Sequence, residues 1–290
     1  MQDILHSSGQ LDTLPYYCIV AKRLGKFLAQ KEIATKTWIP DGPTFLARGS
    51  KFKPLYINEI SANRDFLELR KEKLDSVRAK LTPQEGKVWR YFLPRKLCDL
   101  FYATNGEHPG KDIERIFFDI DIGENTMQED ARKIASMLIE LVQNDDKFNE
   151  VIGKYNIVPM YTGRSFHVYL LLKKPIKHEL YNKHIQFSKK EPLATFTGRW
   201  AKKIGDTLKI KVKGGHEKTK GFINIDPSQT PSGKLARAPF SLHMKDAKTI
   251  DGVAVPLRPE MLKDRDILHH LCSLTPDKVI ENIKKYPIPS

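Results

Sequence analysis

The sequence predicts an α+β fold, in which helices cover an antiparallel sheet. In the second half of the chain, apolar extended runs and amphipathic helical stretches follow the order strand, helix, hairpin, helix, strand, strand. Hydrophobic residues make up 40% of the 290 residues, enough to build a sizeable core. No stretch reaches the roughly 18 consecutive apolar residues that indicate a membrane-spanning helix. The sequence therefore predicts one large domain or two small ones, with no membrane span.

The first strand of this series reads RIFFDIDIG, residues 115–123. Side chains alternate between the two faces of a strand, so Asp119 and Asp121 project from one face while the isoleucines face a core. Two carboxylates about 7 Å apart on one face repel each other unless positive charge lies between them. This strand therefore predicts a neighbouring divalent cation, a pair of basic side chains or open water.

The next two elements are a predicted helix and a predicted hairpin. Residues 126–143 have the spacing of an amphipathic helix, and Thr126 with Glu129 predicts a capping box at its start. Residues 156–172 contain two apolar runs separated by Thr162-Gly163-Arg164, which predicts a β-hairpin.

The second strand of this hairpin is expected to place Ser165, His167 and Tyr169 on one face. Together with Arg164 and the backbone N–H groups of the turn, these side chains suit a phosphate chain. A histidine on a strand is about as often a structural residue, so both interpretations of His167 stay open.

A second amphipathic helix is predicted over residues 191–209, and a strand over residues 222–226 ends at Asp226. The predicted apolar face of this helix consists of Leu193, Phe196, Trp200, Ile204 and Leu208. Asp226 precedes Pro227, so by itself it is better explained as an N-cap or turn-forming residue. The chain then brings Arg237, Ser241, His243 and Lys245 within twenty residues. Three aspartates with two cationic clusters predict two Mg²⁺ or Mn²⁺ ions about 4 Å apart, the arrangement used for displacement at phosphorus.

The charge of the chain is uneven. Against 35 acidic residues there are 49 Lys and Arg, a net charge of +14, and residues 170–220 hold 14 basic and 4 acidic residues, or +10. Such clustering is typical of a protein that binds a polyanion, although a solvated lysine-rich surface is the simpler alternative. The three cysteines, Cys18, Cys98 and Cys272, are scattered. They predict free thiols in a reducing, intracellular compartment, and no structural zinc site.

Three segments, FFDIDIG, TGRSFHVYL and IDPSQTPSGKLARAPFSLHMK, resemble in this order the motifs of archaeo-eukaryotic primases. The motifs of that family are DxD, an SGRxxH-like turn, and a third aspartate followed by a basic residue and S-x-H. The resemblance spans about residues 101–246, because LFYATNGEHPG is similar to the segment that precedes DxD in primase catalytic subunits. The turn here lacks the second glycine and is one residue shorter than in many relatives. The cysteines of the zinc knuckle found in many small primase subunits are missing.

The resemblance implies an RRM-like antiparallel sheet module packed against a second αβ module. We expect a catalytic domain over residues 1–262, divided into about 1–110 and 111–262, and a helical tail over 263–290, from which a further domain could continue. Asp119, Asp121 and Asp226 would be the catalytic metal ligands, and Arg237 would lie near the metals or the α-phosphate. The expected phosphate ligands are Arg164, Ser165, His167, Ser241, His243 and Lys245. The lysines expected to face the template are Lys189, Lys190, Lys202 and Lys203.

The function implied by the resemblance is template-dependent nucleotidyl transfer that makes primers or extends DNA in replication. Its partners would be a single-stranded DNA template, nucleoside triphosphates and a large primase-subunit-like domain or a helicase, with no membrane. A cytoplasmic location and an archaeal, plasmid or viral source are compatible with it.

Three alternatives remain open. They are a repair polymerase of the ligase-associated type, a metal-dependent nuclease, and a non-catalytic basic nucleic-acid-binding module. The nuclease does not explain the cluster from Arg237 to Lys245, and the binding module requires Asp119 and Asp121 to be paired with basic side chains.

Overall fold

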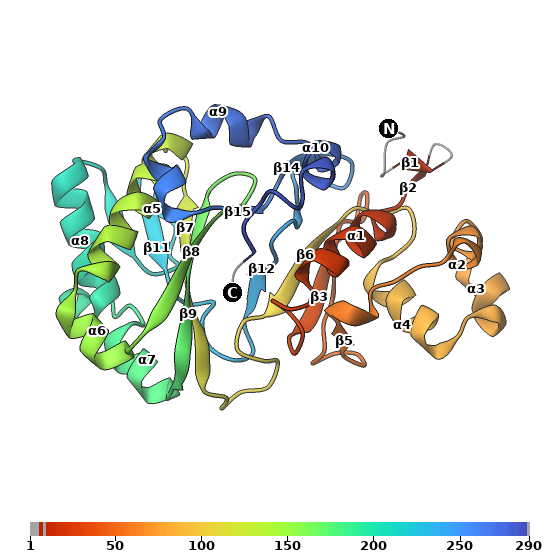
Figure 1. The fold of residues 1–290 in the computed structure, drawn as a ribbon, viewed down its shortest axis with the longest axis horizontal. Helices are drawn as coiled ribbons and strands as arrows, with labels where there is room; N and C mark the ends of the chain where they lie inside the picture. The colour runs from red at the N-terminus through yellow and green to blue at the C-terminus, as the bar shows by residue number, and fades with distance from the viewer. Residues whose placement is uncertain (1–5, 8–9, 289–290) are drawn as a thin grey trace. The chain divides into compact units, whose positions relative to one another are not determined.

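The computed structural model describes residues 6–7 and 10–288, which fall into two compact units (Figure 1). Unit 1 comprises the described residues up to Ala103 together with 237–254 and 274–288. Unit 2 comprises Thr104–Ala236 and Val255–Ser273. The division near residue 103 lies close to the boundary expected near 110, but 237–254 belong to unit 1 rather than to the second module. The expected C-terminal tail is also shared, because it contributes 263–273 to unit 2 and 274–288 to unit 1.

Unit 2 is built on a six-stranded sheet with the strand order β10-β11-β7-β9-β8-β15. The strands are β7 (Ile113–Ile122), β8 (Tyr155–Tyr161), β9 (Phe166–Ile176), β10 (Val212–Gly214), β11 (Ile223–Asp226) and β15 (Val255–Pro256). The helices are α5 (Gln128–Gln143), α6 (Asp146–Ile152), α7 (His178–His184), η3 (Pro192–Ala194), α8 (Phe196–Leu208), η4 (Pro259–Lys263) and α9 (Ile267–Cys272). Each strand pairs antiparallel with its neighbour, except that β10 and β11 are parallel. The predicted α+β class and the predicted hairpin, β8–β9, are confirmed.

Helices α5 and α8 pack on one face of this sheet, against the apolar side chains of β7 (Figure 1). Phe118 of β7 is fully buried, and its ring centroid lies 6.0 Å from that of Trp200 on α8. Trp200 also contacts Phe148, at 4.9 Å between centroids, and donates a hydrogen bond from Nε1 to Asp145. Because side chains alternate along β7, Asp119 and Asp121 project from the opposite face, which these helices leave open.

Both predicted helices of unit 2 begin later than the sequence suggests. Met127 precedes α5 without a side-chain cap, and the predicted capping box is wrong because Thr126 donates to the Gly123 carbonyl at 2.7 Å. Thr195 caps α8 by accepting a hydrogen bond from the Gly198 amide, so α8 begins at Phe196. Leu193 therefore lies before the helix and is 52% exposed, whereas the sequence placed it on the apolar face.

Unit 1 contains a sheet with the strand order β12-β6-β3-β4, with β5 also paired to β3, and the boundary between the units falls within β12. Its strands are β1 (His6–Ser7), β2 (Gln10–Leu11), β3 (Glu32–Thr37), β4 (Phe45–Ala47), β5 (Leu55–Tyr56), β6 (Cys98–Ala103), β12 (Leu235–Arg237), β13 (Leu242–Met244) and β14 (Ile250–Val253). Its helices are α1 (Leu14–Leu24), η1 (Ile57–Glu59), α2 (Arg64–Leu69), α3 (Leu74–Val77), η2 (Arg78–Lys80), α4 (Pro83–Tyr91) and α10 (Pro276–Glu281).

The single helical stretch expected around residues 65–81 is divided into α2, α3 and η2. Arg70 caps the end of α2, and its buried side chain turns inward to pair with Asp12 at 2.7 Å. Among the described residues, no helix is both long and apolar enough to cross a membrane.

The aromatic packing between α8 and the sheet provides a test of the fold. Trp200→Ala should lower the free energy of unfolding by about 3–5 kcal/mol, because it leaves a large cavity against Phe118 and Phe148. Leu193→Ala, at the exposed position that the sequence placed on the same face, should change it by less than about 0.5 kcal/mol. Urea denaturation of both variants measures the difference, and equal losses would contradict this packing.

Candidate active site

The pairing of three strands in unit 2 brings two acids and a histidine into one row. Strand β11 pairs with β7 so that Asp226 lies directly opposite Asp119, and β9 places His167 opposite Asp119 on the other side. Asp121 lies two residues further along β7, opposite Asn224. Directly opposed residues on antiparallel strands have neighbouring side chains on the same face. The face of the sheet that α5 and α8 leave open therefore carries the three predicted aspartates and His167.

His167 is held between a carboxylate and two aromatic rings. Its Nε2 lies 3.3 Å from Oδ1 of Asp119, and its Nδ1 lies 3.4 Å from the hydroxyl of Tyr169. Its ring centroid is 4.7 Å from that of Phe117 in an edge-on contact. The residue is 7% exposed. His167 can therefore fix the orientation of the Asp119 carboxylate from the floor of the site.

The other two carboxylates are turned toward different partners. Asp121 pairs with the ammonium group of Lys218 at 3.0 Å, but the lysine side chain is 71% exposed. Asp226 accepts hydrogen bonds from the amide of Ser228 at 2.9 Å and from its hydroxyl at 2.8 Å. An ion pair with such an exposed lysine contributes little. The Asp121 charge is therefore only weakly compensated by this contact.

Burial and mutual repulsion act on these carboxyl groups. Desolvation by burial raises the pKa of Asp121, and the negative charge of Asp119 raises it further, against the opposing effect of Lys218. Burial likewise raises the pKa of Asp226, and Asp119 adds to it, while the hydrogen bonds from Ser228 lower it. Both shifts mean that the ionised form is disfavoured in the folded protein. A cation placed among these groups would relieve both effects.

The donor set fits a hard divalent cation. Carboxylate oxygens are the ligands that Mg²⁺ prefers, and here they share one face and repel one another. Among the residues that the structure describes, no three His, Cys, Asp or Glu side chains already form a set of metal ligands. The Asp121 and Asp226 carboxylates would have to turn from Lys218 and Ser228 to share an ion with Asp119.

The predicted turn connects β8 and β9 beside this row. Gly163 adopts a φ of +94°, as the tight turn requires, and the Thr162 amide donates to the Ser165 carbonyl at 2.9 Å. The Ser165 hydroxyl donates to the carbonyl of Ile120 on β7, so it attaches the turn to the aspartate strand. Arg164 is exposed. The phosphate-binding roles of Arg164 and Ser165 stay predictions, with Arg164 the more accessible group.

A cavity of about 150 Å³ lies next to Asp226, on the β10–β11 side of the row. Its lining includes Phe187, Lys189, Lys213, His216 and Ser228. The sequence analysis did not single out Lys213, His216 or Ser228. The pair Gly214-Gly215 could have indicated the site, because a Cβ at Gly214 would lie 2.3 Å from the ring of Phe187, so only glycine permits this wall.

The four lysines predicted to face a template are all exposed but do not share one surface. Lys202 and Lys203 belong to α8, which packs on the opposite face of the sheet from the aspartates, and Lys202 pairs with Asp206 at 2.7 Å. Lys189 lines the cavity beside Asp226 and pairs with Glu217. Lys189 thus lines the same cavity as Asp226, a predicted metal ligand. Lys190, the next residue in the chain, is exposed.

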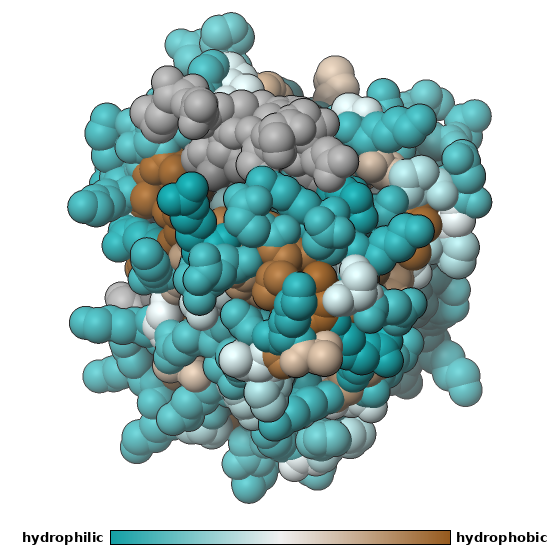
Figure 2. Space-filling model, turned by 90° about the vertical axis from the view of Figure 1, so that its right-hand side faces the viewer, coloured by the Kyte–Doolittle hydropathy of each residue, from teal (hydrophilic) through white to brown (hydrophobic). Residues whose placement is uncertain are grey.

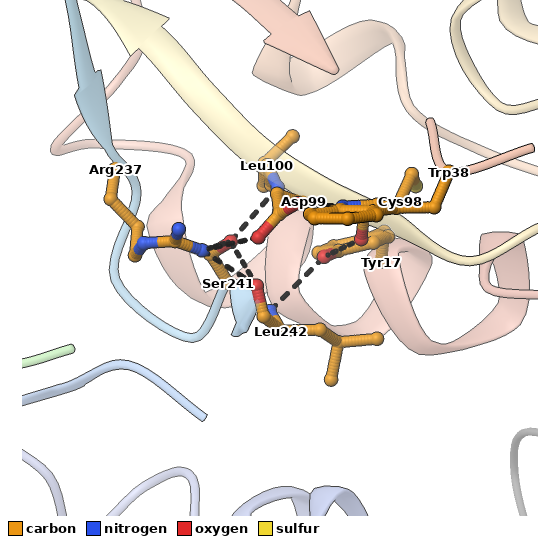
Figure 3. A network of polar contacts seen from close by, with 8 residues as sticks. All are labelled: Tyr17, Trp38, Cys98, Asp99, Leu100, Arg237, Ser241 and Leu242. Atoms are coloured by element: carbon orange, nitrogen blue, oxygen red, sulfur yellow. Dashed lines mark hydrogen bonds and ion pairs between the residues drawn. The ribbon is translucent and has the colours of Figure 1, made fainter. Parts of the chain in front are cut away.

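Arg237 and Ser241 belong to unit 1, where Asp99 organises a buried polar network (Figure 3). Nη1 of Arg237 donates to Oδ1 of Asp99 at 2.6 Å and to the Leu242 carbonyl at 2.8 Å. The second oxygen of Asp99 accepts from Nε1 of Trp38 at 2.6 Å. Asp99 was missed from the sequence, although it interrupts the apolar strand CDLFYA much as Asp119 interrupts its own.

Ser241 is fully buried within this network. Its hydroxyl accepts from the Leu100 amide and donates to the Leu242 carbonyl, each at 2.9 Å. The Leu242 amide in turn donates to the hydroxyl of Tyr17 at 3.1 Å (Figure 3). Here Ser241 supports the β6–β13 connection, and its role as a phosphate ligand stays a prediction.

The remaining predicted ligands, His243 and Lys245, also belong to unit 1. His243 lies on β13 opposite Gly252 and is half-buried, and Lys245 is exposed. The predicted residues are thus divided between the units. Unit 2 contains Asp119, Asp121, Asp226, Arg164, Ser165 and His167, and unit 1 contains Arg237, Ser241, His243 and Lys245.

Comparison with known proteins gives a match at the level of the fold. No protein-family model matches the sequence, and no curated protein matches it. Among solved structures, the chain is similar to the polymerase domain of Mycobacterium tuberculosis Ligase D, a structure in complex with DNA. The TM-score is 0.57 at 19% sequence identity, over 97% of this chain and 91% of that one. The chain therefore shares the fold of that polymerase domain.

The raised pKa of Asp121 predicts how its removal affects stability. Because the pKa is higher in the folded state, the folded protein binds this proton more readily, and stability falls as pH rises through the native pKa. We expect Asp121→Asn to raise the Tm at neutral pH in EDTA, by about 2–4 °C for each 1 kcal/mol of relieved repulsion. The gain in Tm should vanish in acid, where the Asp121 carboxyl is protonated in the folded and in the unfolded protein alike.

Asp206→Asn is the matched control for this measurement. Lys202 lowers the pKa of the exposed Asp206 through a hydrogen bond, so its neutralisation should not raise the Tm. Melting curves of the two variants across a range of pH values make the comparison. A Tm of Asp121→Asn at or below that of the unmodified protein at neutral pH would contradict the electrostatic account.

Proposed function

We propose that this protein is a template-dependent nucleotidyltransferase of the primase-polymerase type that synthesises or extends nucleic-acid strands. The observation that carries this proposal is the strand register that sets Asp226 opposite Asp119, with Asp121 on the same face. Three carboxylates from two strands are a donor set suited to two divalent ions acting on a phosphoryl group. The likeness of the fold to a polymerase domain supports the same reading.

The sheet that carries these residues supports an RRM-like core. Apart from the shorter elements α6, α7, η3 and β10, the chain from β7 to β11 follows the order β7, α5, β8, β9, α8, β11, and these four strands lie in the order β11-β7-β9-β8. Helices α5 and α8 contact each other as well as the sheet. This order places the catalytic strand β7 at the centre, where its carboxylates can be flanked by β9 and β11.

The metal ligands in this proposal are Asp119, Asp121 and Asp226. When bound, Mg²⁺ or Mn²⁺ would activate the attacking hydroxyl and neutralise charge on the triphosphate and the leaving pyrophosphate. His167 orients Asp119 through its 3.3 Å contact. Lys218 is exposed and makes only a surface ion pair with Asp121, so it is easily displaced.

The two sides of the aspartate row suit the two reactants of an in-line displacement. On the β9 side, the turn with Arg164 offers a guanidinium and backbone N–H groups for a nucleoside triphosphate. On the β11 side, the cavity beside Asp226 offers Lys189, Lys213 and His216 for the sugar-phosphate end of the strand that attacks. The attacking and leaving groups of such a reaction lie on opposite sides of the phosphorus.

Arg237, His243 and Lys245, all in unit 1, stay the further phosphate ligands of this proposal. Asp99 holds the Arg237 guanidinium at 2.6 Å and is itself 1% exposed, which makes it a positioning residue for that arginine. A planar guanidinium with its rotamer fixed in this way loses little entropy when it binds a phosphate. Single-stranded DNA and nucleoside triphosphates are the substrates that we propose, in replication.

Two other functions deserve comparison with this proposal. Repair synthesis of the ligase-associated type is favoured by the solved neighbour, which is the polymerase domain of a ligase. A non-catalytic binding module would require the acids to be paired with basic residues, as Asp121 is with Lys218. The exposure of Lys218 and the raised pKa of Asp121 argue against that pairing as a structural bridge.

The decisive variant is the double substitution Asp119→Ala with Asp121→Ala. We expect it to abolish nucleotide incorporation on primed and unprimed templates while single-stranded DNA binding survives, because removing carboxylates from a basic protein does not weaken its attraction for a polyanion. Asp206→Ala, at an exposed position on α8, is the control and should remain active. Incorporation by the double variant at the unmodified rate, in either Mg²⁺ or Mn²⁺, would rule out the two-metal site.

Assays with ribonucleotides and with deoxyribonucleotides, each with and without a primer, separate the candidate activities. Synthesis on unprimed template indicates a primase, and synthesis that needs an annealed end indicates the repair polymerase.

A further inference from the structure

Unit 1 contains a second cavity, of about 420 Å³, between the segment 52–53, the α3–η2 segment and α4. Its lining residues are Phe52, Lys53, Leu74, Arg78, Leu81, Thr82, Pro83, Gly86, Lys87, Arg90 and Tyr91. Four of these residues are basic and none is acidic. Figure 2 views the side on which α2, α3 and α4 lie in Figure 1, and this face is mostly hydrophilic. None of these residues belongs to the aspartate site of unit 2.

The basic groups of this cavity differ in how far they are already compensated. The Lys87 ammonium pairs with Glu59 and donates a hydrogen bond to the Pro54 carbonyl, so its charge is already compensated within the cavity wall. Arg78 pairs with Asp75 at 3.3 Å, but both side chains are more than two-thirds exposed, so this bond competes weakly with another anion. Lys53 and Arg90 are exposed. The cavity is therefore suited to a negatively charged ligand.

An aromatic ring stands beside these charges. Phe52 is half-buried, packs against Phe45 with ring centroids 5.9 Å apart, and carries the Arg90 guanidinium 5.2 Å from its own centroid. A ring held in this way, with a cation beside it, is suited to stack against a nucleobase. Stacking requires the base to be unpaired, which excludes a continuous duplex as the occupant.

Gly86 borders open space at the cavity wall. It lies inside helix α4, where glycine is less favourable than alanine, yet a Cβ placed on it would meet nothing within 4 Å. Its backbone is helical, so a side chain there meets no backbone strain. Any side chain at this position would project into open space at the cavity wall.

We infer that this cavity binds one unpaired nucleotide of a single nucleic-acid strand, with the base against Phe52 and the flanking phosphates against Lys53, Arg78 and Arg90. These three cations come from three separate segments, so they are spaced to follow a backbone rather than gathered around one polyphosphate. The lining contains no carboxylate to hold the Mg²⁺ of a nucleoside triphosphate. The inference rests on the proposed function only in naming this strand as the template.

The test is equilibrium binding of a fluorescent, 5′-hydroxyl oligothymidylate, followed by anisotropy in EDTA with no nucleotide present. Gly86→Leu, which places a bulky side chain at the cavity wall, and Phe52→Ala, which removes the stacking surface, should each weaken binding by about 5- to 150-fold. Gly86→Ala is the matched control, since it should bind as the unmodified protein does and have a higher Tm. Gly86→Leu with an undiminished Tm and an unchanged Kd would overturn the inference.

The charges are tested by the dependence of Kd on salt. Arg78→Gln with Arg90→Gln should reduce the slope of log Kd against log salt concentration by about 1.4, because each lost phosphate contact on a single strand removes about 0.7. Lys22→Gln with Lys26→Gln, two exposed positions of unit 1 outside the cavity lining, should leave the slope unchanged. Equal effects of the two pairs would mean that the cavity has no specific part in binding.

Competition separates a strand from a free nucleotide. Unlabelled oligothymidylate should displace the probe at far lower nucleotide concentration than thymidine monophosphate does. Equal displacement per nucleotide would assign the cavity to a free nucleotide and contradict the inference. The Asp119→Ala, Asp121→Ala variant should bind the probe normally, so a failure of this inference is distinguishable from a failure of the catalytic proposal.

Discussion

Repulsion between carboxylates on one face of a sheet is the constraint on which the organisation of this protein depends. Strand pairing sets Asp226 directly opposite Asp119, and the alternation of β7 adds Asp121 to the same face. Burial and the Asp119 charge then raise the pKa of both neighbouring carboxyls. Such a row contributes nothing to stability, and clustered carboxyl groups with shifted pKa values are typical of functional sites, which is why we propose a metal site here. The packing of α5 and α8 on the other face of the sheet offsets this electrostatic repulsion.

The two faces of β7 divide these roles. Phe118 and its apolar neighbours are buried under α5 and α8, where aromatic contacts with Trp200 anchor the strand. On the open face, His167 and the Ser165 turn hold the acidic row in place through short polar contacts with Asp119 and Ile120. A rigid strand therefore presents the carboxylates, and exposed groups such as Arg164 and Lys218 are free to move toward ligands.

Much of this could be predicted from local patterns in the sequence. Period-two alternation revealed the shared face of Asp119 and Asp121, and the Gly163 turn revealed the β8–β9 hairpin. Features that depend on tertiary contacts could not be predicted, because the spacing of residues in the sequence carries no information about them. Leu193 had the right helical spacing, but the Thr195 cap begins α8 beyond it. Ser241 stays a predicted phosphate ligand, but the hydrogen bonds of its hydroxyl to two backbone groups could not be predicted from its position in the sequence.

The same limit explains Asp99 and the lysines. Asp99 accepts hydrogen bonds from Arg237 and Trp38, which lie 138 and 61 residues away in the chain, so its role could not be predicted from its neighbours in the sequence. Lys202 and Lys203 belong to the most basic stretch of the sequence, but α8 carries them on the face of the sheet opposite the aspartates. Composition thus located a basic segment, and only the fold shows which of its members can reach the acidic row. Lys218, which pairs with Asp121 at 3.0 Å, is one that does, and Lys189 lines the cavity beside Asp226.

The central claim, that these three carboxylates bind divalent cations, is tested most directly by titrating Mn²⁺ and following the free ion by electron paramagnetic resonance. Asp121→Asn and Asp226→Asn should each weaken binding by about tenfold or more, since loss of a ligand costs at least as much as loss of a supporting contact. Asp206→Asn should bind as the unmodified protein does. Unchanged Mn²⁺ binding by both site variants would contradict the account, whatever their activity.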